Sequence, residues 1–221
     1  MISDFSIDYI PFTPTELCIL MGYYGSDKGH YNIETSPHNY TTLYYNLFKN
    51  IRFNKLRIFE LGLGTNNMDV LSNMGINGKP GASLRGWKDF FPSSEIFGAD
   101  IDKRILFKED RITTFYCDQT NPQEIDNLYK NPELSDNFDV IIEDGWHVFE
   151  AQVCFFENSI HKLNNNGYYI IEDVHNQLLD EKYNDQINKW RKMFPDLLFW
   201  VCRLPTKLNA LANNLIIIHK N

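Results

Sequence analysis

The chain has 221 residues, of which 43% are apolar and 23% are charged, and its formal net charge is -8. This composition is typical of a soluble globular protein with one good-sized hydrophobic core. The sequence has no basic stripe, no apolar segment near the roughly 18 residues of a membrane span and no signal peptide. We therefore expect a cytoplasmic protein that binds neither nucleic acid nor membranes.

The first part of the chain is predicted to be helical. Thr13-Pro14-Thr15-Glu16 fits a capping box with proline at the first helical position. A helix should therefore begin there and end near Gly22 or Gly25. Apolar and aromatic residues then recur from Tyr40 to Ile51 at helical spacing, which predicts a second helix with one buried face.

Strands and helices alternate through the rest of the chain. Apolar runs bounded by turn residues predict strands at 56–61, 95–101, 112–117, 138–143, 168–171, 197–202 and 215–219. Helices are predicted at 83–91, from 121–124 onward, at 149–163 and at 180–193, with a turn at Asn164–Gly167. This pattern predicts an α/β, doubly wound, mostly parallel seven-stranded sheet whose last two strands could pair antiparallel. We expect a single domain over 1–221, with a helical cap at 1–54 and a Rossmann-like core at 55–221.

Ligands bind outside the carboxyl ends of the strands in such folds, so the residues there are informative. The first strand ends in Glu60 and continues into Gly62 and Gly64, which allow a sharp turn close to a ligand. A dinucleotide fingerprint would need a third glycine where the chain has Asn67, which weakens the NAD interpretation. An acid at the end of the first strand suits a ligand with an ammonium group. A plain strand-to-helix turn is the alternative.

The second and third strands also end in polar residues. Asp100 could accept hydrogen bonds from both hydroxyls of a ribose, in NAD and in S-adenosylmethionine (SAM) alike. Asp118 and Gln119 could read an adenine amino group. The alternative for this pair is a polar cluster at the N-terminus of a helix.

Acids follow the next two strands directly. Asp144 and His147 come after one strand, and Glu172 and Asp173 after the next. If these strands are neighbours, the three carboxylates converge and repel one another unless a cation lies among them. All-oxygen ligation favours Mg²⁺, Mn²⁺ or Ca²⁺ over Zn²⁺. Solvated acids and a structural histidine are the alternatives.

These residues resemble those of the metal-dependent O-methyltransferases typified by the macrocin and mycinamicin enzymes. The resemblance runs from about Gly25 to Asp173. The matching stretches are Gly25-Ser26-Asp27-Lys28, His38-Asn39-Tyr40-Thr41, Phe59-Glu60-Leu61-Gly62-Leu63-Gly64, Gly81-Ala82-Ser83-Leu84-Arg85, Phe97-Gly98-Ala99-Asp100-Ile101, Asp118-Gln119, Asp144-Gly145-Trp146-His147 and Ile171-Glu172-Asp173.

The resemblance implies a role for each site residue. Those of the SAM pocket would be Ser26, Glu60, Gly62, Gly64 and Ser83, with Asp100 on the ribose, Asp118 and Gln119 on the adenine side and Asp144 beside them. The ligands of Mg²⁺ (or Mn²⁺) would be Asp144, Glu172 and Asp173. His147 would be the general base, next to Asp144 as the second catalytic residue.

The sequence departs from the family at three points. Trp146 replaces the serine of the usual Asp-Gly-Ser-His, and the loop after Gly64 is longer. We also expect that the chain lacks the additional N-terminal domain of the macrolide enzymes. A tryptophan beside the base could reshape the acceptor pocket or stack on a sugar face. These departures concern the acceptor and leave the chemistry intact.

We therefore expect SAM-dependent, Mg²⁺-dependent methylation of a sugar hydroxyl, on a nucleotide-sugar, a capsular or surface polysaccharide, or a glycoside precursor. Chelation to the cation would lower the pKa of the hydroxyl, and His147, with a pKa at or below about 6.5, would accept its proton. Methyl transfer to a nitrogen or phosphoryl-linked acceptor, an NAD-linked oxidoreductase and a non-catalytic SAM-binding subunit are the alternatives. Assembly as a homo-oligomer stays open.

Overall fold

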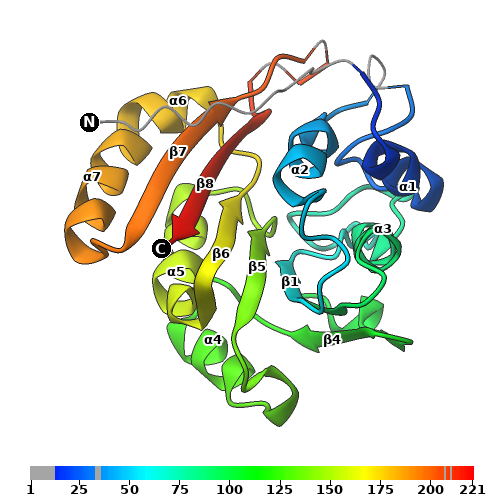
Figure 1. Cartoon of the computed structure of the whole chain (residues 1–221), viewed down its shortest axis with the longest axis horizontal. Helices are drawn as coiled ribbons and strands as arrows, with labels where there is room; N and C mark the ends of the chain where they lie inside the picture. The colour runs from blue at the N-terminus through cyan, green and yellow to red at the C-terminus, as the bar shows by residue number, and fades with distance from the viewer. Residues whose placement is uncertain (1–12, 33–35, 207, 210) are drawn as a thin grey trace.

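The computed structural model describes residues 13–32, 36–206, 208–209 and 211–221. Its centre is a sheet of eight strands in the order β3-β4-β2-β1-β5-β6-β8-β7 (Figure 1). The strands are β1 Arg57–Leu61, β2 Glu95–Asp100, β3 Lys108–Glu109, β4 Ile112–Tyr116, β5 Phe138–Glu143, β6 Leu163–Ile171, β7 Leu197–Arg203 and β8 Asn214–Lys220.

The predicted doubly wound, mostly parallel arrangement is confirmed. β4, β2, β1, β5 and β6 are parallel, whereas β8 pairs antiparallel with β6 and with β7. The predicted antiparallel pairing of the last two strands is therefore confirmed as well. The eighth strand is β3, which makes a two-residue antiparallel pairing with β4 at one edge. A strand of this length is too short for an alternating pattern to be recognised in a sequence.

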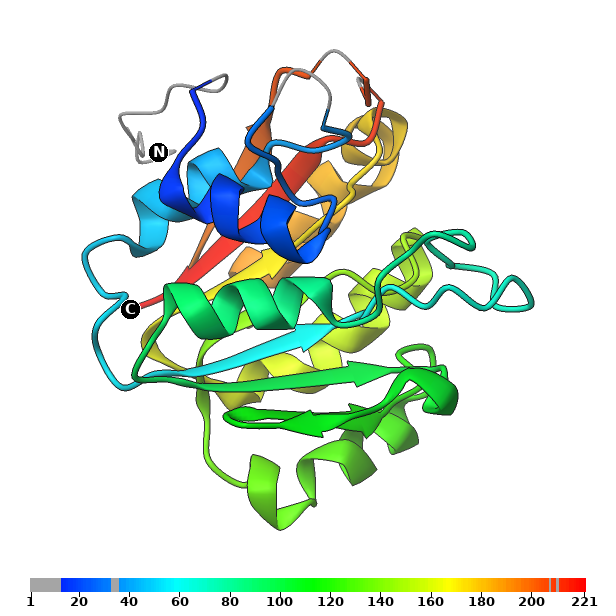
Figure 2. The same ribbon diagram turned by 90° about the vertical axis from the view of Figure 1, so that its right-hand side faces the viewer.

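Helices cover both faces of the sheet (Figure 2). One face carries α1 Glu16–Tyr24, α2 Tyr40–Phe48 and α3 Ala82–Phe90, and the other carries α4 Pro122–Tyr129, α5 Phe149–Ser159 and α7 Asn184–Met193. Shorter helical segments are Lys103–Ile105, Pro132–Leu134, Ile160–Lys162, α6 Asn176–Leu178 and the π-helical turn Leu179–Tyr183. Each face of the sheet buries its own apolar cluster, because alternate residues of the strands point to opposite faces. Among the described residues, no helix is long and apolar enough to cross a membrane.

Among the sequence-based boundaries that differ from the structure, two have a clear local cause. The first helix is capped by Thr15, whose hydroxyl accepts from the backbone N–H of Cys18, so Pro14 lies before the helix and not at its first position. The predicted turn at Asn164–Gly167 lies inside β6, and the preceding helix ends at Ser159. The pairing of β6 with β5 is irregular there, because Leu163 pairs with Phe138 and Tyr168 already pairs with Val140, and Asn166 has a left-handed φ of 61°. The side chain of Asn164 donates to Asp139 of β5 at 2.9 Å. The first helix ends as predicted at Gly25, which has a left-handed φ of 86°.

The strand register brings the predicted site residues to one edge. Leu61 at the end of β1 pairs with Glu143 at the end of β5, and Glu143 pairs with Ile171 at the end of β6. The residues that follow these three strands therefore leave the sheet side by side. The prediction that residues 1–221 form a single domain stays a prediction.

Candidate active site

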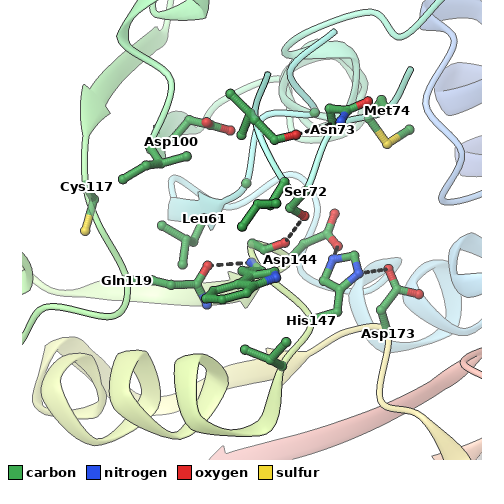
Figure 3. A pocket seen from close by; sticks show the side chains of 18 of the residues that line it. Leu61, Ser72, Asn73, Met74, Asp100, Cys117, Gln119, Asp144, His147 and Asp173 are labelled. Atoms are coloured by element: carbon green, nitrogen blue, oxygen red, sulfur yellow. Dashed lines mark hydrogen bonds and ion pairs between the residues drawn. The ribbon is translucent and has the colours of Figure 1, made fainter. Parts of the chain in front are cut away.

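A cavity of about 610 Å³ lies over the carboxyl ends of the central strands (Figure 3). Of the predicted site residues, those that line it are Gly62, Gly64, Asp100, Asp118, Gln119, Asp144, His147 and Asp173. Ser26, Glu60, Ser83 and Glu172 do not line it. The structure thus divides the predicted site into residues that face the cavity and residues that lie behind its wall.

The glycine turn after β1 brings two strand ends into contact. Gly62 has a φ of 91°, and a Cβ atom there would lie 1.9 Å from the backbone oxygen of Asp144. The backbone N–H of Asp144 donates to the carbonyl of Leu61 at 2.9 Å, which continues the pairing of β1 with β5 past the strands. Only glycine fits here, because a side chain would push Asp144 away from β1.

Asp100 and Asp118 are partly engaged in shaping the cavity. The carboxylate of Asp100 accepts from the backbone N–H of Leu63 at 2.7 Å and from that of Asp102 at 2.8 Å, and its burial raises its pKa. Asp118 accepts from both the backbone and the hydroxyl of Thr120. Each carboxylate oxygen has two lone pairs, so both residues keep acceptor capacity toward the cavity.

Gln119 joins two strands at the cavity floor. Its amide nitrogen donates to Glu143 at 2.9 Å, and its amide oxygen accepts from the backbone N–H of Trp146 at 2.6 Å. A Cβ atom on Gly145 would lie 1.9 Å from that amide oxygen, so glycine allows the close approach. Gln119 therefore supports the loop that carries His147, a contact that the adenine assignment did not include.

His147 lies between two carboxylates that face the cavity (Figure 3). Its Nε2 is 3.2 Å from Oδ1 of Asp144, and its Nδ1 is 3.5 Å from Oδ2 of Asp173. Burial would lower the pKa of His147, but the two carboxylates outweigh it and raise this pKa to about 10. The expectation of a pKa at or below about 6.5 included the charge of a bound metal, so it stays a prediction. Without a metal, both ring nitrogens have an anionic neighbour, which accounts for the raised pKa.

Behind this group, Lys28 holds a second set of acids. Its ammonium nitrogen bonds to Oδ2 of Asp144 and lies 2.6 Å from Oε2 of Glu172 and 3.8 Å from Oε1 of Glu60. The other oxygen of Glu172 accepts from Tyr44 at 2.6 Å. Burial opposes the charge of Lys28, but the surrounding carboxylates raise its pKa well above the usual value. Lys28 is therefore a buried cation among anions.

Glu60 is enclosed in the same region. The side chain of Ser83 donates to its Oε1, and the indole of Trp87 donates to its Oε2 at 2.5 Å. Glu60 is fully buried, and burial raises its pKa. Ser26 accepts from the backbone N–H of Lys28 through its hydroxyl. The cofactor-binding roles of Glu60, Ser83 and Ser26 stay predictions. None of the three lines the cavity, so a direct contact with a ligand would require the residues in front of them to move.

The start of α2 and the residues just before it supply outer contacts that the sequence did not indicate. Tyr40 donates its hydroxyl to Oδ1 of Asp173 at 2.8 Å, and Nε2 of His38 lies 3.4 Å from the same oxygen. Nδ1 of His38 is 3.0 Å from the amide oxygen of Asn213. The motifs containing Lys28 and His38 were visible in the sequence, but nothing in their spacing indicated which acids they would touch.

The long loop after Gly64 forms a wall of the cavity. Thr65 and Asn67 bond to Asp102 at one end, and the hydroxyl of Ser72 donates to the carbonyl of Gly145 at 2.9 Å at the other. Residues 70–74 line the cavity opposite the acids. Two apolar residues of the lining are exposed at the rim, Leu71 by 86% and Trp146 by 41%.

The residues present fit a divalent cation. Ligand atoms of Asp144, His147 and Asp173 all lie within 4.8 Å of one another. Two carboxylates that face a cavity are the hard oxygen donors that Mg²⁺ and Mn²⁺ prefer. Glu172 is less accessible than predicted, because both of its oxygens are already hydrogen-bonded and its side chain is only 1% exposed.

Comparison with known proteins supports the resemblance seen in the sequence. No protein-family model matches the chain. The chain is 33% identical over 138 residues to 8-demethyl-8-(2-methoxy-alpha-L-rhamnosyl)-tetracenomycin-C 3'-O-methyltransferase of Streptomyces olivaceus. The matched stretch covers 62% of this chain and 32% of that protein. It is 32% identical over 139 residues to demethylmacrocin O-methyltransferase of Streptomyces fradiae, with coverages of 63% and 32%. The chain thus spans about a third of the length of the curated relatives that it matches.

The fold is found in a solved structure of the mycinamicin pathway. The methyltransferase MycE, in complex with Mg, S-adenosylhomocysteine (SAH) and mycinamycin VI, superposes with a TM-score of 0.68 at 20% identity, over 95% of this chain and 56% of that one. The chain therefore has the methyltransferase Rossmann-like fold. The predicted resemblance to macrocin-type and mycinamicin-type sugar O-methyltransferases is confirmed.

Proposed function

We propose that this chain transfers a methyl group from SAM to a hydroxyl group of a sugar, with the help of Mg²⁺ or Mn²⁺. The observation that carries the proposal is the position of His147, held between Asp144 and Asp173 at one side of a cavity of about 610 Å³. The same cavity begins at the Gly62 and Gly64 turn, where the relatives' fold class binds its cofactor. An acid-flanked histidine and a cofactor turn in one cavity suit proton removal beside a methyl donor.

The chain's own residues divide the work. Gly62 and Gly64 would give the methionine part of SAM close access to the backbone, and Asp100 would accept from its ribose. Asp144 and Asp173 would hold the cation, which, when bound, supplies Lewis-acid chemistry that lowers the pKa of a hydroxyl. His147 would then accept the hydroxyl proton, and the cavity walls would align the oxygen with the methyl group.

The lining favours an uncharged acceptor over a nucleotide-sugar. Among the described residues that line the cavity, five are aspartates and none is Lys or Arg. A nucleotide-sugar carries a diphosphate, which proteins bind with Arg, Lys or backbone N–H groups, and which these aspartates would repel. The exposed apolar lining residues Leu71 and Trp146 instead suit an apolar aglycone. Of the three acceptors expected from the sequence, we therefore propose the glycoside precursor, in a neutral form, over the nucleotide-sugar and the polysaccharide.

A methyl-transfer assay with paired acceptors tests the proposal. The purified chain would be incubated with SAM, Mg²⁺ and either p-nitrophenyl α-L-rhamnoside or dTDP-L-rhamnose, and the methylated product measured by mass spectrometry. We expect turnover of the aryl glycoside, little or none of the nucleotide-sugar, and loss of turnover with EDTA. Turnover of dTDP-rhamnose alone would overturn the acceptor class. Turnover that persists in metal-stripped protein would overturn the metal requirement.

A further inference from the structure

The acid cluster of this site already contains one positive charge. Lys28 is 2% exposed, and its ammonium group bonds to Asp144 and Glu172 on either side. Its Nζ also lies 3.8 Å from Oε1 of Glu60, so a third carboxylate is next to the ammonium group. A lysine is rarely buried to this extent unless it is paired, because removing its charge from water is costly.

The backbone around Lys28 is fixed, so this arrangement does not depend on a free side chain. The carbonyl of Lys28 accepts from the backbone N–H of Thr41 in the first turn of α2 at 3.2 Å. A Cβ atom on the next residue, Gly29, would lie 1.8 Å from the hydroxyl of Thr41, so glycine allows the two segments to touch. The ammonium group is thus held in place from the N-terminal side of the molecule.

The acids fall into an inner and an outer half. The inner half comprises Glu60 and Glu172, which are buried and do not line the cavity. The outer half comprises Asp173 with His147, which line the cavity. Asp144 belongs to both, because its Oδ2 bonds to Lys28 and its Oδ1 faces His147. A cation that entered the cavity would meet the outer half first and would find Lys28 between Asp144 and Glu172.

We propose that Lys28 is a positioning residue that acts as a built-in cation, which fills the inner half of the acid cluster and confines the divalent cation to the outer half beside His147. The inference rests on the proposed function, since it concerns where that cation binds. Without Lys28, the inner carboxylates would draw a divalent cation inward, away from His147 and from the acceptor hydroxyl. Lys28 thus lowers the total affinity of the acid cluster for cations but keeps the bound cation next to His147.

Titration of Mn²⁺ into wild type and Lys28→Met, followed by electron paramagnetic resonance of the free ion, tests the inference. We expect Lys28→Met to bind about tenfold more tightly than wild type or to take up one additional ion, because a unit charge at this distance is removed from among the acids. Its kcat with an aryl rhamnoside should fall even at saturating Mn²⁺. A lysine that only joined the N-terminal segment to the sheet would give the opposite result, with weaker binding in the variant.

Two further variants keep the test decisive. In Lys28→Met/Glu172→Gln the inner half loses one charge of each sign, so this chain should bind Mn²⁺ less tightly than Lys28→Met and should fold even if the single variant does not. Lys79→Met is the matched control, because Lys79 is an exposed lysine beside the same N-terminal segment, and it should behave as wild type.

The results separate the two proposals. Equal or weaker Mn²⁺ binding in Lys28→Met, or a double variant that binds no less tightly than the single one, would overturn the role of Lys28. A wild type that binds no Mn²⁺ would contradict the proposed metal site. If Lys28→Met then bound one ion, Lys28 would be shown to fill the inner half of the acid cluster, but its role in confining a cation to the outer half would be overturned together with the metal site.

Discussion

Nδ1 of His147 lies 3.5 Å from Oδ2 of Asp173, on the opposite side of the ring from Asp144. The two carboxylates raise the pKa of His147 to about 10, although burial opposes this. In the metal-free protein we therefore expect the imidazole to stay protonated from pH 6 to pH 9. Nuclear magnetic resonance of ring-labelled histidine should show a midpoint near the raised value, whereas a midpoint near 6.5 would contradict it.

The upward shift of the His147 pKa also makes the stability of the metal-free protein depend on pH. Because the pKa in the folded state is raised, the contribution of His147 to stability is complete below about pH 6.5, its usual pKa, and is lost as pH rises toward about 10. Metal-free His147→Gln should therefore lose less stability than wild type over that interval. Mg²⁺ should bring the pKa of His147 down, because it takes up charge on Asp144 and Asp173, and an unchanged titration in saturating Mg²⁺ would contradict the proposed ligands.

The two neighbouring acids after β6 should differ in metal binding. Asp173→Asn removes a carboxylate that faces the cavity, so we expect Mn²⁺ affinity to fall by more than about 100-fold, beyond the usual effect of an outer residue. Glu172→Gln changes a side chain already bonded to Lys28 and Tyr44, and affinity should fall by about tenfold or less. Calorimetry on both variants decides this. Equal losses would restore Glu172 as a direct ligand, as the sequence alone suggested.

Two glycines that both have a positive φ provide a controlled test of the predicted cofactor turn. Gly62 and Gly75 have φ values of 91° and 73°, but a Cβ atom would meet Asp144 only at Gly62, since nothing lies within 4 Å at Gly75. Gly75→Ala should cost about 1 kcal/mol, the strain of a left-handed residue. Gly62→Ala should cost more than about 3 kcal/mol and abolish SAH binding, since the backbones of two strand ends must separate.

Thermal unfolding and SAH calorimetry compare the two glycine variants. If Gly62→Ala bound SAH as wild type does, the glycine turn would not be the cofactor site. NADH serves as the competing ligand in the same experiment. Stabilisation by NADH and none by SAH would favour the oxidoreductase alternative, because binding to the native state must raise the melting temperature.

The sequence predicted the fold and the cavity-facing half of the site well, for a physical reason. Strand ends in a doubly wound sheet meet at one edge, so Asp100, Asp144 and Asp173 could be placed together from strand order alone. The partners of Glu172 could not, since Lys28 lies 144 residues away and reaches it only through the packing of the N-terminal segment on the sheet. The raised pKa of His147 without a metal depends on how close its two ring nitrogens come to Asp144 and Asp173, and strand order does not give these distances.

Trp146 should affect the acceptor more than the cofactor. It stands where the family usually has serine, lines the cavity and is 41% exposed at the rim. Contact between its ring and an aryl aglycone would contribute about 0.5–1.5 kcal/mol, so Trp146→Ser should raise KM for p-nitrophenyl α-L-rhamnoside by about two- to tenfold. SAH affinity should stay unchanged. A variant with lower KM would show instead that the indole narrows the entrance.

The strongest test of the chemistry is His147→Ala. Its side chain is 38% exposed and its nearest charged partners, Asp144 and Asp173, both face the cavity, so removal leaves no apolar void in the core. We expect methyl transfer to slow by about 10²–10⁴-fold, the usual contribution of a positioned base, while SAH affinity is kept. Loss of a cation between two carboxylates should, if anything, tighten Mn²⁺ binding. If His147 were instead a structural histidine, its removal would lower the melting temperature and leave the shape of the pH–rate profile unchanged.

The pH–rate profile tests the same role of His147. In the wild type with Mg²⁺, the rate should rise with pH through the pKa of His147. The variant should lose this rise and recover part of its rate as the hydroxide concentration increases. A variant as fast and as stable as wild type at every pH would exclude both roles, and Glu143, buried next to this group with a pKa raised by burial to about 7, would become the candidate base.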